Sequence, residues 1–217
     1  MKYLIVAPHE DDETLGCGGV IRMLRDKGEE VHVVFMTDGR YGSPLPEERG
    51  SKKLIETRKM EAIEALSVLG VDKDNIVFLD FEDGKLKKHM KEAEEKLTNI
   101  VRELKPNRIY YTVPIDAHSD HEATGKIVER VIKRELGRRE DFGRSFLIWK
   151  PRIKARDPSI PLKYIKSLFF RREIEEVDIT NYLEIKREAL MKYKSQIKWF
   201  SSSFIRRFLT DHERFFK

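Results

Sequence analysis

The sequence predicts an α/β fold in which a mostly parallel sheet lies between helices on both faces. Short runs rich in β-branched residues alternate with amphipathic segments over residues 3–136, and such alternation is typical of strands joined by right-handed helical crossovers. The amphipathic segments end at a glycine or before a proline, as helices commonly do. At 217 residues the chain is long enough for one substantial domain.

The alternating elements follow one another in a regular order. The expected strands are nearly continuous apolar runs, which is typical of strands buried on both faces of a sheet. In such a sheet a ligand site lies beyond the carboxyl ends of the strands. We expect strands at 3–7, 31–36, 75–81 and 108–113, and helices at 18–28, 58–70, 92–105 and 123–136.

The pattern beyond Leu136 is less regular. We expect a strand at 145–150, a loop with three prolines at 151–167, a strand at 174–180 and a helix at 183–199. No internal repeat and no low-complexity linker divides the chain, so a second large domain is not expected.

The last residues, 201–217, combine aromatic and basic side chains at roughly helical spacing. We therefore expect residues 1–200 to form a single domain, and residues 201–217 to form a C-terminal helical extension, an amphipathic tail that packs on the domain or extends from it. An alternative role for this tail is peripheral contact with a membrane surface, because basic and aromatic residues together suit the lipid interface.

The composition indicates a water-soluble protein with a densely charged surface. The chain has 43 basic and 38 acidic residues and a formal net charge of +5, and its high Lys, Arg and Glu content resembles thermophile usage. Its one cysteine, Cys17, cannot form an internal disulfide, which favours a reducing compartment. No run approaches the ~18 apolar residues of a transmembrane helix, and the N-terminus is unlike a signal peptide. We therefore expect a cytoplasmic protein.

Histidines and carboxylates follow the ends of three predicted strands. Four consecutive acidic residues, 10–13, lie beside His9, and carboxylates this close repel one another unless a cation lies among them. Imidazole and carboxylate groups suit Zn²⁺, and three such ligands with an open position for water make a hydrolytic site. The pattern favours a metal-dependent hydrolase over an ordinary acidic helix start. The polar residues at these strand ends are His9, Asp11, Asp12, Glu13, Thr37, Asp38, Gly39, Asp116, His118, Asp120 and His121.

Several motifs run along the chain in a fixed order. They are "PHEDDETLGCGG" at 8–19, "TDG" at 37–39, "RKMEAIEALSVLG" at 58–70, "DAHSDH" at 116–121, "VDIT" at 177–180 and "KREALMKYKSQ" at 186–196. Together they resemble the PIG-L/LmbE-like family of zinc-dependent N-acetylglucosaminyl deacetylases, whose signatures include P-H-x-D-D-E and H-x-D-H. The resemblance spans roughly residues 3–196 and implies a Rossmann-like three-layer α/β/α sandwich.

The resemblance implies a reaction and a metal centre. His9, Asp12 and His121 would be the ligands of one Zn²⁺ per chain, although a His₂-Asp site also accepts other divalent metals. Asp11 would be the general base that takes a proton from the metal-activated water. The implied reaction removes an acetyl group from a substrate that contains N-acetylglucosamine.

The resemblance also implies roles for residues around that centre. His118 would stabilise the oxyanion or protonate the leaving amine, Asp120 would orient a nearby histidine, and Arg58 would contact the substrate. Two positions depart from the family pattern, because Glu10 stands where proline is common and Arg40 where an acidic residue is common. Arg40 suggests an anionic group on the substrate, and the alternative is a solvated loop charge.

Two other interpretations stay open at this point. The same site could hydrolyse the amide of a non-sugar N-acyl compound, or the chain could be a non-catalytic module that binds an anionic ligand through its basic surface. Against the second, Lys and Arg are spread along the chain, no RNA-binding signature is present, and Asp11 is retained. We therefore expect no nucleic-acid partner and a small-molecule or glycoconjugate substrate bearing N-acetylglucosamine. The rest of the substrate and the oligomeric state, including a homo-oligomer, stay open.

Overall fold

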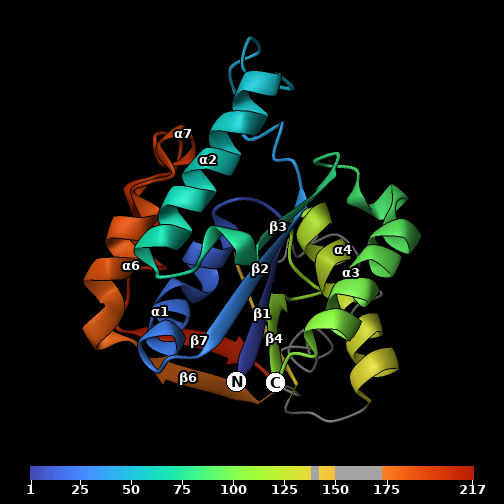
Figure 1. The fold of residues 1–217 in the computed structure, drawn as a ribbon. Coiled ribbons are helices and arrows are strands. Elements are labelled where there is room, and N and C mark those ends of the chain that lie inside the picture. Colours follow the sequence, from blue (N-terminus) through green and yellow to red (C-terminus); the bar gives the residue numbers. More distant parts are fainter. Residues whose placement is uncertain (138–141, 150–172) are drawn as a thin grey trace, which may run out of the picture.

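A seven-stranded sheet forms the centre of the molecule (Figure 1). The structure, a computed structural model, describes residues 1–137, 142–149 and 173–217. The strand order is β3-β2-β1-β4-β5-β7-β6; β1 to β5 run parallel, and β7 is antiparallel to both its neighbours. The predicted fold class is therefore confirmed. The strands are β1 (Lys2–Ala7), β2 (Glu30–Thr37), β3 (Ile76–Phe81), β4 (Arg108–Thr112), β5 (Gly143–Phe146), β6 (Ile174–Asp178) and β7 (His212–Phe216).

Helices cover both faces of the sheet, with α1, α2 and α6 on one face and α3 and α4 on the other (Figure 1). The helices are α1 (Asp12–Asp26), α2 (Lys52–Val68), α3 (Met90–Leu104), α4 (Ser119–Val131), α6 (Leu183–Leu190), α7 (Lys194–Ile197) and α8 (Ser202–Arg206). Short 3₁₀ turns lie at Lys73–Asn75, Leu86–Lys88 and Thr180–Tyr182, and a π-helical turn at Ile132–Leu136 extends α4.

The central strand β1 shows why the apolar runs are continuous. Successive side chains of a strand point to opposite faces, so Ile5 joins the core under α1 and α2 while Leu4 and Val6 join the core under α3 and α4. All three are fully buried. A strand covered on both faces has no solvent side, which explains the absence of polar alternation.

Helices α1, α2 and α4 each begin four or more residues earlier than their apolar pattern predicts. Helix α2 starts at Lys52, where the Ser51 side chain accepts a hydrogen bond from the Leu54 N–H at 3.1 Å. Helix α4 starts at Ser119, directly after His118. The first turn of α4 is polar, and α2 opens with two lysines before the buried Leu54, so an apolar pattern read from residues 58 and 123 onward misses both helix starts. The residues of the "DAHSDH" motif consequently lie at a helix N-terminus and not in a free loop.

The C-terminal residues differ from the expected helical extension. Only Ser202–Arg206 is helical, and His212–Phe216 is a strand placed between β5 and β6. Phe204 and Phe215 are buried in the core, so these aromatic side chains serve packing. The helical spacing was misleading because a five-residue strand with two aromatics gives no clear period. The expected loop at 151–167 lies outside the described residues.

A buried ion pair holds helix α1 where its backbone is irregular. At Cys17 the helix is interrupted (φ −144°), which frees backbone groups on either side. Glu213 of β7 accepts hydrogen bonds from both N–H groups of residues 19–20 at 2.8 Å. Lys186 of α6 donates to Glu213 at 2.7 Å and to the Leu15 carbonyl oxygen at 3.0 Å. Residues near the C-terminus thus fix the helix that starts at Asp12.

None of the helices in the described part of the chain combines the length and the hydropathy that a bilayer crossing requires.

Candidate active site

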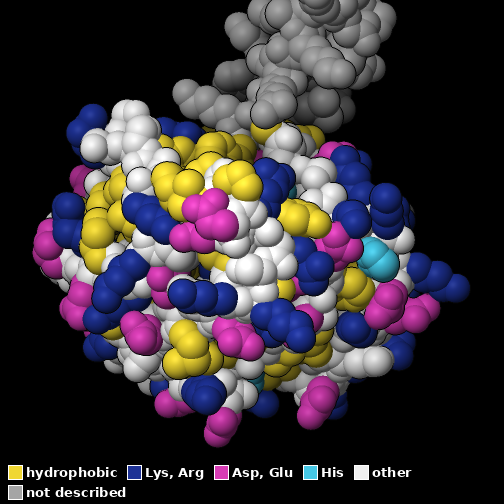
Figure 2. Space-filling view, turned by 90° about the horizontal axis from the view of Figure 1, so that it is seen from above, with side chains coloured by type: hydrophobic (Ala, Val, Ile, Leu, Met, Phe, Trp, Pro, Cys, Tyr) yellow, Lys and Arg dark blue, Asp and Glu magenta, His cyan; other side chains and the backbone are white. Residues whose placement is uncertain are grey.

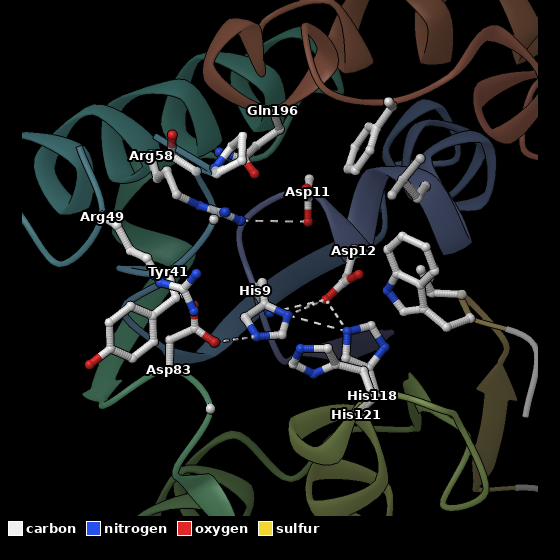
Figure 3. A pocket seen from close by; sticks show the side chains of 18 residues that line it. His9, Asp11, Asp12, Tyr41, Arg49, Arg58, Asp83, His118, His121 and Gln196 are labelled. Atoms are coloured by element: carbon white, nitrogen blue, oxygen red, sulfur yellow. Dashed lines mark hydrogen bonds and ion pairs between the residues drawn. The ribbon is translucent and has the colours of Figure 1, made fainter. Parts of the chain in front are cut away.

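A pocket of about 460 Å³ lies at the carboxyl ends of the parallel strands (Figure 3). The loop after β1 contributes His9 and Asp11, the loop after β3 contributes Asp83, and the start of α4 contributes His118 and His121. These segments lie far apart in the sequence, and the parallel sheet brings them together because all of its parallel strands end at this edge.

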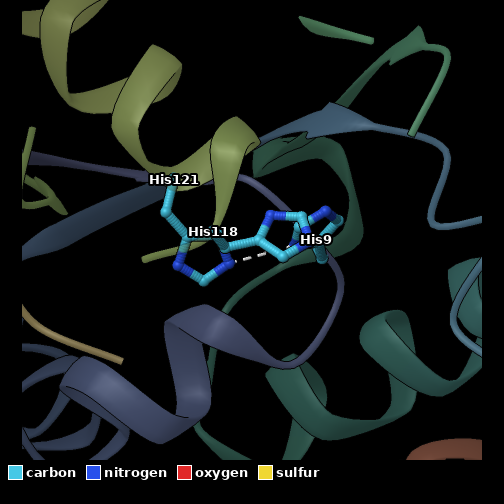
Figure 4. Close-up of side chains that lie close together, drawn as sticks. All are labelled: His9, His118 and His121. Atoms are coloured by element: carbon cyan, nitrogen blue, oxygen red, sulfur yellow. Dashed lines mark hydrogen bonds between the residues drawn. The ribbon is translucent and has the colours of Figure 1, made fainter. Parts of the chain in front are cut away.

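Three potential ligand atoms converge at the floor of this pocket. His9 Nδ1 lies 3.1 Å from Asp12 Oδ2, the same oxygen lies 3.1 Å from His121 Nε2, and the two ring nitrogens are 3.2 Å apart. All three side chains are nearly buried. Figure 4 shows the rings of His9, His118 and His121 gathered in this place. Two imidazole nitrogens that face each other at this distance need a proton or a cation between them.

The donor set fits a divalent metal. Atoms bonded to one tetrahedral Zn²⁺ at about 2.0–2.2 Å lie about 3.3–3.6 Å from one another, and the three edges here are within about 0.5 Å of that spacing. Two further groupings of ligand atoms share His9: one with His118 and His121, and one with Asp83 and Asp120. Imidazole and carboxylate together suit Zn²⁺, and other divalent ions as well.

The outer ring nitrogens of His9 and His121 face carboxylates. His9 Nε2 lies 3.1 Å from Asp83 Oδ1 and 3.4 Å from Asp120 Oδ2, and His121 Nδ1 lies 3.5 Å from Asp116 Oδ2. Carboxylates in this position fix the ring orientation of metal-binding histidines. Asp120 was expected beside a histidine. Asp83 was missed, although it follows the end of β3, where the strand-end rule would have found it.

These carboxylates change how the histidines titrate in the metal-free protein. Burial by itself would lower the pKa of His121, but Asp12 and Asp116 outweigh burial and raise that pKa to about 9. Burial opposes protonation of His9 too, and Asp83 and Asp12 still raise its pKa well above the usual value. A proton therefore occupies this place until a metal ion displaces it.

His118 has the opposite tendency. Burial, followed by the nearby His9 and His121, lowers the pKa of His118 to about 4, so the ring is neutral near pH 7. Its Nδ1 accepts a hydrogen bond from the Asp120 N–H at 3.3 Å, which assigns the ring proton to Nε2. The ring lies edge-on to His9 with centroids 4.8 Å apart and lines the pocket. A neutral ring with a free N–H suits hydrogen-bond donation.

Asp11 lies between the ligands in the sequence and occupies a strained backbone position. Its φ of 146° is rare for a residue with a side chain, and it precedes the first turn of α1. The carboxyl group lines the pocket and is buried, and burial raises its pKa well above the usual value, with Asp12 adding to the effect. Such a carboxyl group can accept a proton near neutral pH.

Arg58 lines the pocket from α2 and is held by the loop after β1. Its Nε donates to Glu10 Oε2 at 3.1 Å, its Nη2 donates to the Glu10 carbonyl oxygen at 2.8 Å, and Nη2 lies 3.7 Å from Asp11 Oδ1. Two glycines make room for this pair, because a Cβ at Gly42 would lie 1.8 Å from Arg58 Nη1 and a Cβ at Gly39 2.3 Å from Glu10 Oε2. The carboxylate of Glu10 thus balances the positive charge of the Arg58 guanidinium.

The structure does not bring Arg40 into the pocket lining. Its Nε donates to Asp38 Oδ2 at 2.7 Å, and its backbone N–H donates to Asp38 Oδ1 at 3.2 Å. A cation that the sequence did not single out, Arg49, lines the pocket instead, above the ring of Tyr41. Trp149 and Phe200 also line the pocket and add apolar surface.

Comparison with known proteins identifies the family. The model of the family described as "PIG-L: GlcNAc-PI de-N-acetylase" matches residues 4–132, which include His9, Asp12 and His121. The chain belongs to the PIG-L family. The resemblance inferred from the motifs is therefore confirmed.

Several relatives of this PIG-L family member are named as deacetylases. The chain is 29% identical over 199 residues to a diacetylchitobiose deacetylase of Thermococcus kodakarensis, an alignment that covers 90% of this chain and 70% of the relative. It is 33% identical over 135 residues to a probable N-acetyl-α-D-glucosaminyl L-malate deacetylase of Bacillus cereus, which covers 60% of each chain. The structure of an N,N'-diacetylchitobiose deacetylase from Pyrococcus horikoshii superposes with a TM-score of 0.75 at 25% identity, covering 99% of this chain and 82% of that one.

Proposed function

We propose that this chain is a metal-dependent N-deacetylase that hydrolyses the acetamide of an N-acetylglucosamine-containing small molecule or glycoconjugate. The observation that carries the proposal is the convergence of His9 Nδ1, Asp12 Oδ2 and His121 Nε2 within 3.2 Å of one another. The deacetylase activity of the relatives supports the reaction class.

The three converging residues would hold one Zn²⁺ or a similar divalent ion. Such an ion supplies a Lewis acid for the amide carbonyl and lowers the pKa of a bound water. Asp83 and Asp116 keep the two histidine rings oriented toward it, through the ring nitrogens that face away from the ligand position.

The remaining pocket residues divide the proton transfers and the charge stabilisation. Asp11 accepts the proton of the attacking water, which its raised pKa favours. His118 donates its Nε2–H to the oxygen on which negative charge develops, because a neutral ring with this tautomer is a hydrogen-bond donor. The proton held by Asp11 is then available to the leaving amine. Arg58 orients the substrate from the wall formed by α2.

Several expectations remain proposals of ours. We propose residues 1–200 as the functional domain, with 201–217 completing its sheet, and a cytoplasmic location in a thermophile. Seen from above in Figure 2, basic and acidic side chains are interspersed over the described part of this face, which supports the absence of a nucleic-acid partner. The aromatics buried near the C-terminus weigh against peripheral membrane contact by that segment.

Acetate release by purified, metal-loaded protein tests the reaction. The panel comprises N-acetylglucosamine, its short oligomers, and inositol- and nucleotide-linked forms, with Asp11→Asn as the control that preserves shape. We expect release from one class of sugar, lost in the variant and after chelation. Release only from a non-sugar N-acyl compound would replace the proposed substrate, and a protein that binds no divalent metal would refute the site.

A further inference from the structure

Among the described residues that line the pocket, Arg49 and Arg58 carry guanidinium groups, and the two differ in how their charge is balanced. The charge of Arg58 is offset by Glu10, which is fully buried beside it. Arg49 is exposed, and in the described part of the chain no carboxylate lies within ion-pair distance of it. Arg49 therefore brings an unbalanced positive charge to the pocket.

The guanidinium of Arg49 is held in place by its flat face. It lies over the Tyr41 ring, 5.1 Å from the ring centroid, an arrangement that attracts a cation to the aromatic face. Stacking occupies the face of a guanidinium and leaves its in-plane N–H groups able to donate, and those groups match the two oxygens of a carboxylate or phosphate.

The stacked pair is anchored to the floor of the pocket. The Tyr41 N–H donates to Asp83 Oδ2 at 2.9 Å, and the Tyr41 hydroxyl donates to Glu82 Oε1 at 3.0 Å. The other oxygen of Asp83 faces His9 at 3.1 Å. Arg49 thus has a fixed place relative to the catalytic centre, and Figure 3 shows Tyr41 and Arg49 on the opposite side of His9 from His118 and His121.

We propose that Arg49 is a specificity-determining residue that binds an anionic group, a carboxylate or a phosphate, on the part of the substrate beyond the N-acetylglucosamine ring. This inference rests on the proposed deacetylase function and narrows its substrate class. The sequence suggested an anionic substrate group from Arg40, but the charge of Arg40 is paired with Asp38. We therefore transfer that role to Arg49.

Paired substrates test the assignment. The neutral substrate is the methyl glycoside of N-acetylglucosamine, and the anionic ones are N-acetylglucosamine 1-phosphate and the N-acetylglucosaminyl glycoside of L-malate. The variants are Arg49→Gln, Arg49→Lys and the control Arg102→Gln. Arg102 is an exposed arginine of α3 that pairs with Glu135 in the turn after α4 and does not line the pocket.

We expect Arg49→Gln to lower the ratio of anionic to neutral kcat/KM by about 10-fold, mainly through KM, which is the scale of a hydrogen bond to a charged group. Arg49→Lys should restore part of the anionic-to-neutral ratio, and Arg102→Gln should leave the ratio unchanged. Added salt should reduce the ratio in the unmodified protein, because it screens the charge of Arg49. Preference for one anionic arm identifies phosphate or carboxylate as the group. An unchanged ratio in Arg49→Gln would overturn the proposal.

Binding separates this inference from the proposed reaction. Calorimetry with N-acetylglucosamine 1-phosphate, on metal-loaded Asp11→Asn protein with and without Arg49→Gln, reports recognition without turnover. Weaker binding by the Asp11→Asn, Arg49→Gln double variant supports the anion site, whether or not any substrate releases acetate. A lack of acetate release would refute only the proposed deacetylase reaction. Equal binding by both proteins refutes the role of Arg49.

Discussion

The ion pair between Lys186 and Glu213 should be a major determinant of stability. Both side chains are almost fully buried, and Glu213 also accepts hydrogen bonds from the N–H groups of Gly19 and Val20, which follow the irregular turn of α1 at Cys17. Substituting Glu213→Gln keeps the shape and removes the charge, so the Lys186 ammonium stays buried without a counterion. Breaking a buried pair in this way costs about 3–5 kcal/mol, and for a chain of this size that corresponds to about 6–20 °C in Tm.

Urea unfolding followed by circular dichroism measures this loss against a matched control. Glu176 on β6 forms a similar pair with Arg214, at 2.6 Å, but both side chains are at least half exposed. Glu176→Gln should therefore change the free energy of unfolding by less than about 1 kcal/mol.

The same reasoning makes a prediction for the double variant. Lys186→Met combined with Glu213→Gln removes both charges, so its loss should be smaller than the sum of the two single losses by at least about 1 kcal/mol. Additive single effects, or a Glu213→Gln loss no larger than that of Glu176→Gln, would refute the view that charge pairing holds the interrupted helix.

Three further outcomes follow from the geometry of the pocket. Gly42→Ala would place a Cβ 1.8 Å from Arg58 Nη1, so the arginine must move. Steady-state kinetics should then show KM raised by about 10-fold. An unchanged KM would argue against contact between Arg58 and the substrate. Asp83→Asn should weaken Zn²⁺ binding about 10–100-fold by calorimetry, because it removes the carboxylate behind His9; equal affinity would contradict that role. Since the metal-free pKa of His121 is raised to about 9, its ring is protonated below that pH and must lose the proton to bind metal. Zn²⁺ affinity, measured against a chelating dye, should therefore rise from pH 6 to pH 9, and a flat profile would exclude this competition.

The sequence was informative where local pattern and topology agree. Continuous apolar runs predicted the parallel strands, and parallel strands end at one edge, so the amino-acid pattern alone was enough to expect the polar clusters at 9–13 and 116–121 together. The choice of His9, Asp12 and His121 within those clusters came from the family resemblance. The same rule would have added Asp83, which follows β3 just as His9 follows β1. Asp83 has no histidine beside it in the chain, so it did not stand out as a member of a His and carboxylate cluster.

The sequence was uninformative where long-range contacts decide. Nothing in "HERFF" indicates that it inserts between β5 and β6, because a short strand has no period of its own and its partners lie far away in the chain. The partner of Lys186 could not be inferred either, since a buried ion pair depends on how α6 and β7 pack. Arg40 is a different case, because its partner is local: the sequence suggested an anionic substrate group or solvent for its charge, whereas Arg40 donates to Asp38, two residues before it.

The four carboxylates at 10–13 show what crowding of charge does and does not imply. Glu10 turns away to Arg58, and Glu13 turns into the core, where Tyr193 donates a hydrogen bond to it at 2.5 Å and burial raises its pKa to about 7. Only the two aspartates between them face the pocket. Most of the repulsion among the four carboxylates is thus relieved because the side chains point apart, Arg58 pairs with Glu10, and Glu13 is readily protonated. A metal ion is needed to explain only the position of Asp12 Oδ2. Crowded acids alone are therefore weak grounds for a metal site; the strong grounds are the two imidazole nitrogens that meet that oxygen.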